Sequence, residues 1–88
     1  MKFQIIWSEP AAKELKKLDR SIAKRIFKKV TQLGENPLIF DVTKIVGEPY
    51  YRLRVGDYRV IFDIQNDKLR IIILKAGHRK NIYNRLFK

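Results

Sequence analysis

Three arginines in the second half of the chain have a spacing that can bring their side chains together. Arg52 and Arg54 are two residues apart, and Arg59 follows just after the dipeptide Gly56-Asp57. Residues two apart on a strand share a face, and Gly-Asp is typical of a two-residue hairpin turn. Such a turn pairs Arg54 with Arg59 and leaves three guanidinium groups clustered without an acid among them. Guanidinium groups bind phosphate and stabilise developing negative charge, so the pattern predicts a surface for a polyanion.

Further candidate side chains lie on either side of this cluster. His78 is the only histidine, and imidazole is the one side chain whose ordinary pKa suits proton transfer near neutral pH. It could equally be a structural histidine at the start of the C-terminal tail. Tyr83 could stack on a nucleotide base or could pack the tail onto the sheet. Additional polyanion contacts are expected from Tyr50, Lys80 and Arg85, and Arg79 emerges near the arginines.

The composition limits what else the chain can do. Its 88 residues are expected to form one domain, and 20 Lys and Arg against 9 Asp and Glu give a net charge of +11. Residues 50–88 hold ten Lys and Arg against three Asp, so +7 of that charge falls in this part. The absence of cysteine excludes disulfides and thiolate chemistry, and the single histidine excludes a multi-histidine metal site within the chain. We expect no metal, no cofactor, no membrane partner and a cytoplasmic location.

The elements that must position these side chains can be predicted from their periodicity. Alternating apolar residues predict a first strand at residues 3–7. Two helices follow, capped by Ser8 and Asp19, and the second is expected to stop at Gly34. Residues 34–49 are expected to form a connecting loop. Three strands at residues 50–55, 58–64 and 68–75 then form an antiparallel meander with turns at Gly56-Asp57 and Asn66-Asp67.

The last strand is expected to break at Ala76-Gly77, and residues 78–88 to carry a short C-terminal helix. The predicted fold class is therefore α+β, with an N-terminal strand and a helical hairpin packed on a sheet that the meander completes. The hairpin register is expected to pair Val55 with Tyr58, which turns Leu53 and the apolar side chains of the meander toward the helices.

Two motifs resemble a known family. The run YRLRVGDYRVIF at residues 51–62, followed by AGHRKNIY at residues 76–83, is similar to the RelE branch of the RelE/ParE toxin superfamily. The resemblance covers nearly the whole chain. It implies a RelE-like fold and the toxin of a type II toxin-antitoxin system, an endoribonuclease that cleaves mRNA in the ribosomal A site and inhibits translation. The family's functional basic and tyrosine positions match Arg52, Arg54, Arg59, Arg79 and Tyr83.

The chain departs from the family pattern at Arg52 and Arg54, where the best-known members carry lysine. A lysine can lose its proton and act as a base, whereas holding an arginine neutral at pH 7 costs roughly 7 kcal/mol. The proton acceptor for the 2′-hydroxyl is therefore open between His78, Tyr83 and the RNA of the ribosome.

The resemblance also implies a partner that keeps the toxin silent. We expect a small, acidic, partly helical antitoxin similar to RelB, whose helix lies at or displaces the tail of residues 78–88. Two other functions stay open at this point. One is a ParE-like inhibitor of DNA gyrase, and the other is a non-catalytic module that binds RNA or the ribosome through the same basic surface.

Overall fold

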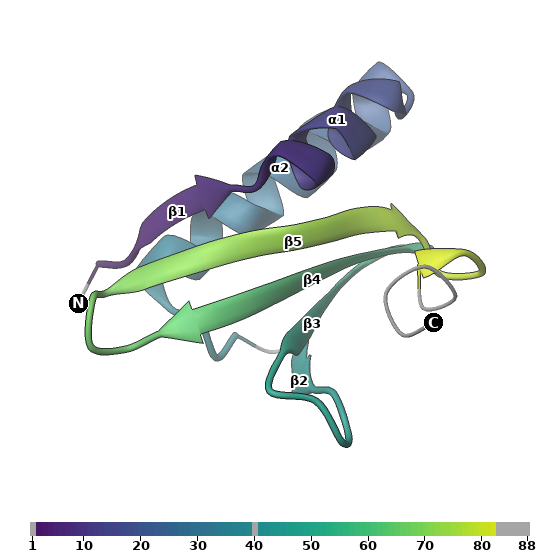
Figure 1. Ribbon diagram of the computed structural model, residues 1–88. Helices are drawn as coiled ribbons and strands as arrows, with labels where there is room; N and C mark the ends of the chain where they lie inside the picture. Colours follow the sequence, from purple (N-terminus) through teal and green to yellow (C-terminus); the bar gives the residue numbers. More distant parts are fainter. Residues whose placement is uncertain (1, 40, 83–88) are drawn as a thin grey trace.

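In the computed structural model, which describes residues 2–39 and 41–82, a helical hairpin lies against one face of a five-stranded sheet (Figure 1). The strand order is β1-β5-β4-β3-β2. β1 runs parallel to β5, and the other neighbours are antiparallel. The elements in chain order are β1 (Gln4–Trp7), α1 (Glu9–Lys17), α2 (Arg20–Glu35), β2 (Val42–Lys44), β3 (Tyr51–Val55), β4 (Tyr58–Gln65) and β5 (Arg70–His78).

The two helices begin at the predicted caps. The Ser8 hydroxyl oxygen accepts a hydrogen bond from the backbone N–H of Ala11 at 3.3 Å, and the Asp19 carboxylate accepts one from Ser21 at 3.3 Å. These bonds satisfy N–H groups that have no partner within a helix. The predicted end of the second helix is wrong by one residue, because α2 continues to Glu35.

Gly34 allows β1 to pack closely against α2. The backbone N–H of Phe3 donates to the Gly34 carbonyl oxygen at 2.7 Å, and a Cβ on Gly34 would lie 3.0 Å from the Phe3 carbonyl oxygen. This glycine is therefore needed for a close approach of two backbones and not for ending the helix.

The hairpin register is confirmed. Arg54 pairs with Arg59, Leu53 with Val60, and Val55 with Tyr58. Gly56 has a φ of 59°, a left-handed value that favours glycine, as expected at the first position of a type II′ turn. The side chains turned toward the helices form the core together with three buried residues of α2, and the fully or nearly fully buried members include Ile26, Val30, Leu33, Leu53, Val55, Val60, Phe62, Ile71 and Ile73.

Two predicted connections in the sheet are wrong. The expected loop at 34–49 contains β2, whose Thr43 pairs with Arg52 and extends the sheet by one strand. The β4–β5 connection is a four-residue loop and not the two-residue turn expected at Asn66-Asp67. Gln65 pairs with Arg70 across this loop, and Leu69 adopts a φ of 52°.

β5 also continues through the predicted break. A register shift opposite Ile61 and Phe62 leaves one extra residue, Leu74, in β5. Beyond this bulge the backbone N–H of Ala76 donates to the Glu14 carboxylate at 3.0 Å, and pairing with β4 extends to His78. The predicted C-terminal helix falls largely on residues 83–88, which lie outside the described part of the chain. No helix among the described residues is long and apolar enough to cross a membrane.

Candidate functional site

Arg52, Arg54 and Arg59 surround a shallow cavity of about 260 Å³ on the sheet face opposite the helices. The strand pairing brings them there, because Arg52 and Arg54 alternate with the buried Leu53 on β3 and Arg59 lies directly opposite Arg54. Asp41 and Thr43, from the segment that forms β2, complete the wall. We call these five residues the arginine site.

Two of the arginines are held by neutral acceptors. The Nε of Arg52 donates to the Thr43 hydroxyl oxygen at 3.2 Å across the β2–β3 pair. The Nη1 of Arg59 donates to the carbonyl oxygens of Gly56 at 2.8 Å and Tyr58 at 2.9 Å. Hydrogen bonds to carbonyl oxygens orient a guanidinium group without cancelling its charge, so Arg59 keeps its attraction for a phosphate.

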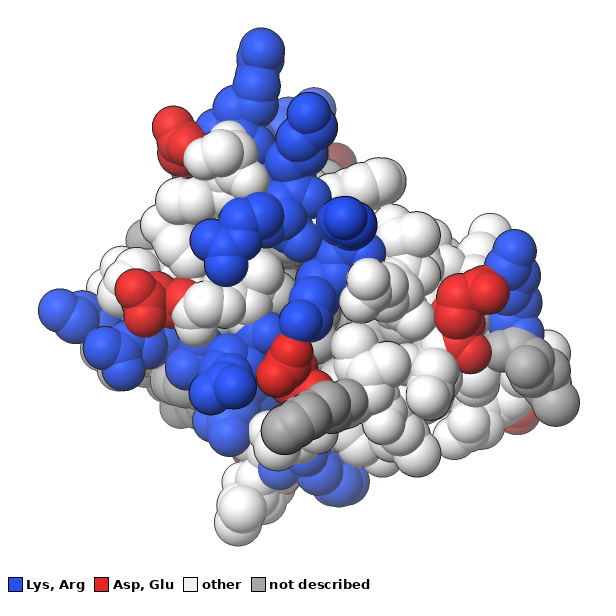
Figure 2. All heavy atoms as spheres, turned by 180° about the vertical axis from the view of Figure 1, so that it is seen from behind, with Lys and Arg blue, Asp and Glu red and all other residues white. Residues whose placement is uncertain are grey.

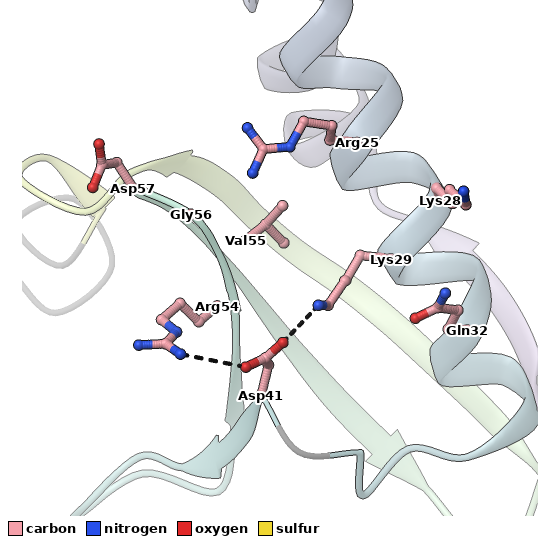
Figure 3. A pocket seen from close by; sticks show the side chains of 9 residues that line it. All are labelled: Arg25, Lys28, Lys29, Gln32, Asp41, Arg54, Val55, Gly56 and Asp57. Atoms are coloured by element: carbon pink, nitrogen blue, oxygen red, sulfur yellow. Dashed lines mark ion pairs between the residues drawn. The ribbon is translucent and has the colours of Figure 1, made fainter.

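The third arginine shares an acid with helix α2. Asp41 contacts Lys29 Nζ at 2.6 Å through one carboxylate oxygen and Arg54 Nη2 at 3.6 Å through the other (Figure 3). The hydrogen bond from Lys29 lowers the pKa of Asp41, and the Arg54 guanidinium lowers it further. The expectation that no acid lies among the arginines is therefore wrong, because a tertiary contact carries Asp41 to this position.

Arg79 lies at the end of the sheet beside the β3–β4 turn. Its backbone N–H donates to the Asp57 carbonyl oxygen at 2.9 Å, and its Nε lies 3.8 Å from the Asp57 carboxylate. It directly follows the end of β5, two residues after Gly77, which lies opposite Arg59. Arg79 is thus close in the fold to the arginine site without lining its cavity, and Lys80 follows it as an exposed residue.

The structure separates His78 from the arginines. His78 pairs with Tyr58 across β4 and β5, and their rings meet edge to face with centroids 5.3 Å apart. Tyr58 packs against the core, so His78 lies on the helix-covered face. Its Nδ1 accepts a hydrogen bond from the backbone N–H of Lys80 at 3.2 Å. These contacts are those of a structural histidine.

The remaining predicted residues are distributed as follows. Tyr50 is half-buried just before β3, and its carbonyl oxygen accepts from the Ile45 N–H at 3.0 Å. It does not line the arginine cavity. Tyr83 and Arg85 lie outside the described residues.

Sequence reasoning missed two residues of this face. Asp41 and Thr43 were assigned to a loop, although their alternation with Val42 is a weak strand signal. Ile61 lies opposite Arg52, as the expected register requires, and is fully buried.

The basic residues form a broad surface beyond the arginine site. Figure 2 shows Lys and Arg side chains gathered over the helical hairpin and toward the lower edge of the sheet, with few acidic side chains among them. Among residues 2–39 and 41–82, no group of three or more His, Asp or Glu side chains is arranged to hold a metal ion.

The fold and the arginine site together define a small α+β protein that presents three arginines around one cavity on an open sheet face. Residues 5–83 match the family described as the ParE toxin of the type II toxin-antitoxin system parDE. The chain is 34% identical over 86 residues to "Toxin RelE3" of Methanocaldococcus jannaschii, which covers 92% of this chain and 96% of the relative. It is 26% identical over 83 residues to "mRNA interferase toxin RelE" of Escherichia coli, which covers 91% of this chain and 86% of the relative.

The fold is also similar to a solved structure. The crystal structure of an archaeal RelE-RelB complex from Pyrococcus horikoshii aligns with a TM-score of 0.79 and 30% sequence identity, over 92% of this chain and 99% of that chain. The chain belongs to the RelE/ParE family of type II toxin-antitoxin toxins, and the resemblance drawn from its two motifs is confirmed.

Proposed function

We propose that the protein is an endoribonuclease toxin that cleaves mRNA in the ribosomal A site and thereby inhibits translation. The observation that carries the proposal is the convergence of Arg52, Arg54 and Arg59 around one cavity on an open sheet face. The name of the Escherichia coli relative, an mRNA interferase, supports the same substrate class. The activity would be exerted in the cytoplasm, where translated mRNA is found.

The chemistry proposed is attack of a ribose 2′-hydroxyl on the adjacent phosphorus. The O2′–P bond forms as the 2′-hydroxyl loses its proton to a base, the P–O5′ bond breaks, and the leaving O5′ takes a proton from water, so that the products are a 2′,3′-cyclic phosphate and a 5′-hydroxyl end. The phosphorane between them carries an additional negative charge. Arg59 faces the cavity with its charge uncancelled, so we assign it to stabilising that charge, with Arg52 and Arg54 binding the phosphate oxygens. Arg79 is assigned to the leaving-group side or a neighbouring phosphate.

The proton acceptor for the 2′-hydroxyl must come from outside the arginine site. The arginines are too weakly acidic to lose a proton, and the lowered pKa of Asp41 makes its carboxylate a weak base. His78 lies on the other face of the sheet. We therefore assign this step to Tyr83 or to the RNA of the ribosome, and the second alternative would make cleavage depend on the ribosome. No metal or cofactor enters the proposed reaction.

The proposal includes a cognate antitoxin of the RelB type. The related archaeal structure is a RelE-RelB complex, and the net charge of +11 favours an acidic partner. Such a partner silences the toxin by covering the arginine site or the segment that follows β5.

The test is cleavage of mRNA on programmed ribosomes. We expect Arg59→Ala to lower the rate by about 10²–10³-fold, the loss typical when one preorganised donor to a developing charge is removed. Arg79→Ala is expected to lower it as well. Arg20→Ala, which removes the same charge from an exposed position at the start of α2, is the matched control and is expected to retain activity.

Three results would contradict the proposal. Wild-type cleavage rates in both Arg59→Ala and Arg79→Ala would remove the arginines from the reaction. Inhibition of DNA supercoiling with translated mRNA left intact would instead establish a gyrase inhibitor. RNA or ribosome binding without cleavage by the wild-type chain would reduce the protein to a binding module.

A further inference from the structure

A second hollow lies beside the arginine site, between α2 and the β3–β4 turn (Figure 3). It has a volume of about 600 Å³. α2 lines one side with Arg25, Lys28, Lys29 and Gln32, which share a helix face because they are three or four residues apart. The other side is the end of β3 and its turn. We call this hollow the helix groove.

The charges in the helix groove do not cancel. Asp41 is engaged by Lys29 and Arg54, and Asp57 lies within 3.8 Å of Arg79. Within the described part of the chain, no ion pair engages Arg25 or Lys28. The groove therefore presents two exposed cations, one helical turn apart on α2, that no ion pair among the described residues engages, and its lining has four cationic against two acidic side chains.

The absence of a side chain at Gly56 leaves room for Arg25 beside the turn. A Cβ on Gly56 would lie 3.0 Å from the Nη2 of Arg25, and the φ of 59° favours glycine there independently. The guanidinium group of Arg25 thus reaches across from α2 and lies against the backbone of the β3–β4 turn (Figure 3).

The helix groove continues directly from the arginine site, since Arg54 and Asp41 line both cavities. An extended strand bound at the three arginines would therefore meet Arg25 and Lys28 on passing Arg54. Val55 is the only apolar residue among those that line the groove, and it is 6% exposed. Protein partners anchor on buried apolar or aromatic side chains, whereas phosphate groups require only cations, so the lining favours nucleic acid.

We propose that the helix groove binds backbone phosphates of the same RNA strand that is cleaved in the arginine site. These phosphates neighbour the cleaved phosphodiester, and Arg25 and Lys28 contact them. This inference rests on the proposed function, because it takes the strand in the arginine site to be RNA. It extends the recognised substrate from a single phosphodiester to a segment of several nucleotides, without base specificity.

The test is salt-dependent binding of 2′-O-methyl RNA, which cannot undergo attack by the 2′-oxygen. Oligonucleotides of about three and about nine nucleotides would be titrated with the full chain by fluorescence anisotropy at several KCl concentrations. In the double variant Arg25→Ala with Lys28→Ala, the slope of log K against log salt for the longer RNA is expected to fall by about 1.4, or about 0.7 per lost contact. Binding of the shorter RNA is expected to stay the same.

The matched control is the double variant Lys16→Ala with Lys24→Ala. It removes the same total charge from exposed helix positions that do not line the groove. If the slope of log K against log salt falls by the same amount in both double variants, the effect is one of overall charge and the inference is overturned. It is also overturned if the groove variant binds the longer RNA normally and instead loses affinity for a copurifying acidic protein.

Failure of this inference can be told apart from failure of the proposed function. If Arg59→Ala loses cleavage but the groove variant keeps the wild-type slope of log K against log salt, the proposed nuclease function stands and the groove is not an RNA-binding site. Normal cleavage in Arg59→Ala would reject the arginine site whatever the groove variant does.

Discussion

Asp41 joins three parts of the molecule through one carboxylate. It immediately precedes β2, its carbonyl oxygen accepts the backbone N–H of Arg54 at 3.0 Å, and its side chain bridges Arg54 on the sheet and Lys29 on α2. A single acid between two cations reduces the repulsion that Arg54 meets from the arginine opposite it. Asp41 therefore stabilises the cluster, and no ion pair among residues 2–39 and 41–82 engages Arg59.

Replacing this carboxylate is expected to lower stability in a pH-dependent way. The folded protein holds the pKa of Asp41 below its ordinary value of 3.8, so the ionised side chain stabilises the fold. This contribution is complete above the ordinary pKa and disappears as the pH falls through the lowered one. Asp41→Asn should shift the urea midpoint downward at pH 7, and the difference from wild type should shrink below about pH 4. A difference that is constant from pH 7 to pH 3 would contradict the ion-pair explanation.

His78 is expected to be dispensable for cleavage. Its ring packs edge to face with Tyr58 on the helix-covered side, and its Nδ1 already accepts a hydrogen bond. His78→Ala should retain the cleavage rate on programmed ribosomes within about threefold while lowering Tm, because an aromatic pair contributes about 0.5–1.5 kcal/mol. The pH profile of cleavage decides the matter, because replacing a catalytic imidazole would change the shape of the profile, whereas replacing a structural one would leave it unchanged.

The β3–β4 hairpin is the element that assembles the arginine site, and it is also the part that sequence reasoning predicted best. Its register depends on the turn at Gly56-Asp57 and on the strict alternation of successive side chains between the two faces of the sheet. Both are local properties of the chain. β2, the bulge at Leu74 and the position of Asp41 depend on contacts between segments far apart in sequence. A short strand such as Val42–Lys44 has too few residues for its pattern to distinguish it from a loop.

The turn is expected to be sensitive to a side chain at Gly56. Alanine at a left-handed φ costs about 1–2 kcal/mol, which for a domain of this size lowers Tm by roughly 5–15 °C. Gly47→Ala is the matched control, because Gly47 has a φ of 80° and no atom within 4 Å of a built Cβ. Both variants should lose similar stability in thermal unfolding. Only Gly56→Ala should also weaken the salt dependence of binding to the longer RNA, since it displaces Arg25 from the turn.

At the scale of the whole molecule, the excess positive charge has a defined distribution. Residues 50–88 carry +7, and the helices contribute Arg25, Lys28 and Lys29 to a groove that adjoins the arginine site. Composition alone predicted a polyanionic partner. It could not predict that charges from α2 and from the sheet line two connected cavities, because that depends on how the helical hairpin packs on β3.

This distribution predicts how the proposed antitoxin associates. A net charge of +11 attracts an acidic partner over distances that salt screens, so the association rate constant of the copurifying antitoxin should fall at least about tenfold between about 0.05 M and 0.5 M KCl. The dissociation rate constant should change much less, because it is governed by short-range contacts that form after docking. Stopped-flow fluorescence measures the association rate constant, and displacement by a competitor measures the dissociation rate constant. Lys16→Ala with Lys24→Ala should reduce the salt dependence of association only slightly. An association rate that is independent of salt would mean that the antitoxin recognises an apolar surface of the toxin, and the basic surface would then serve RNA alone.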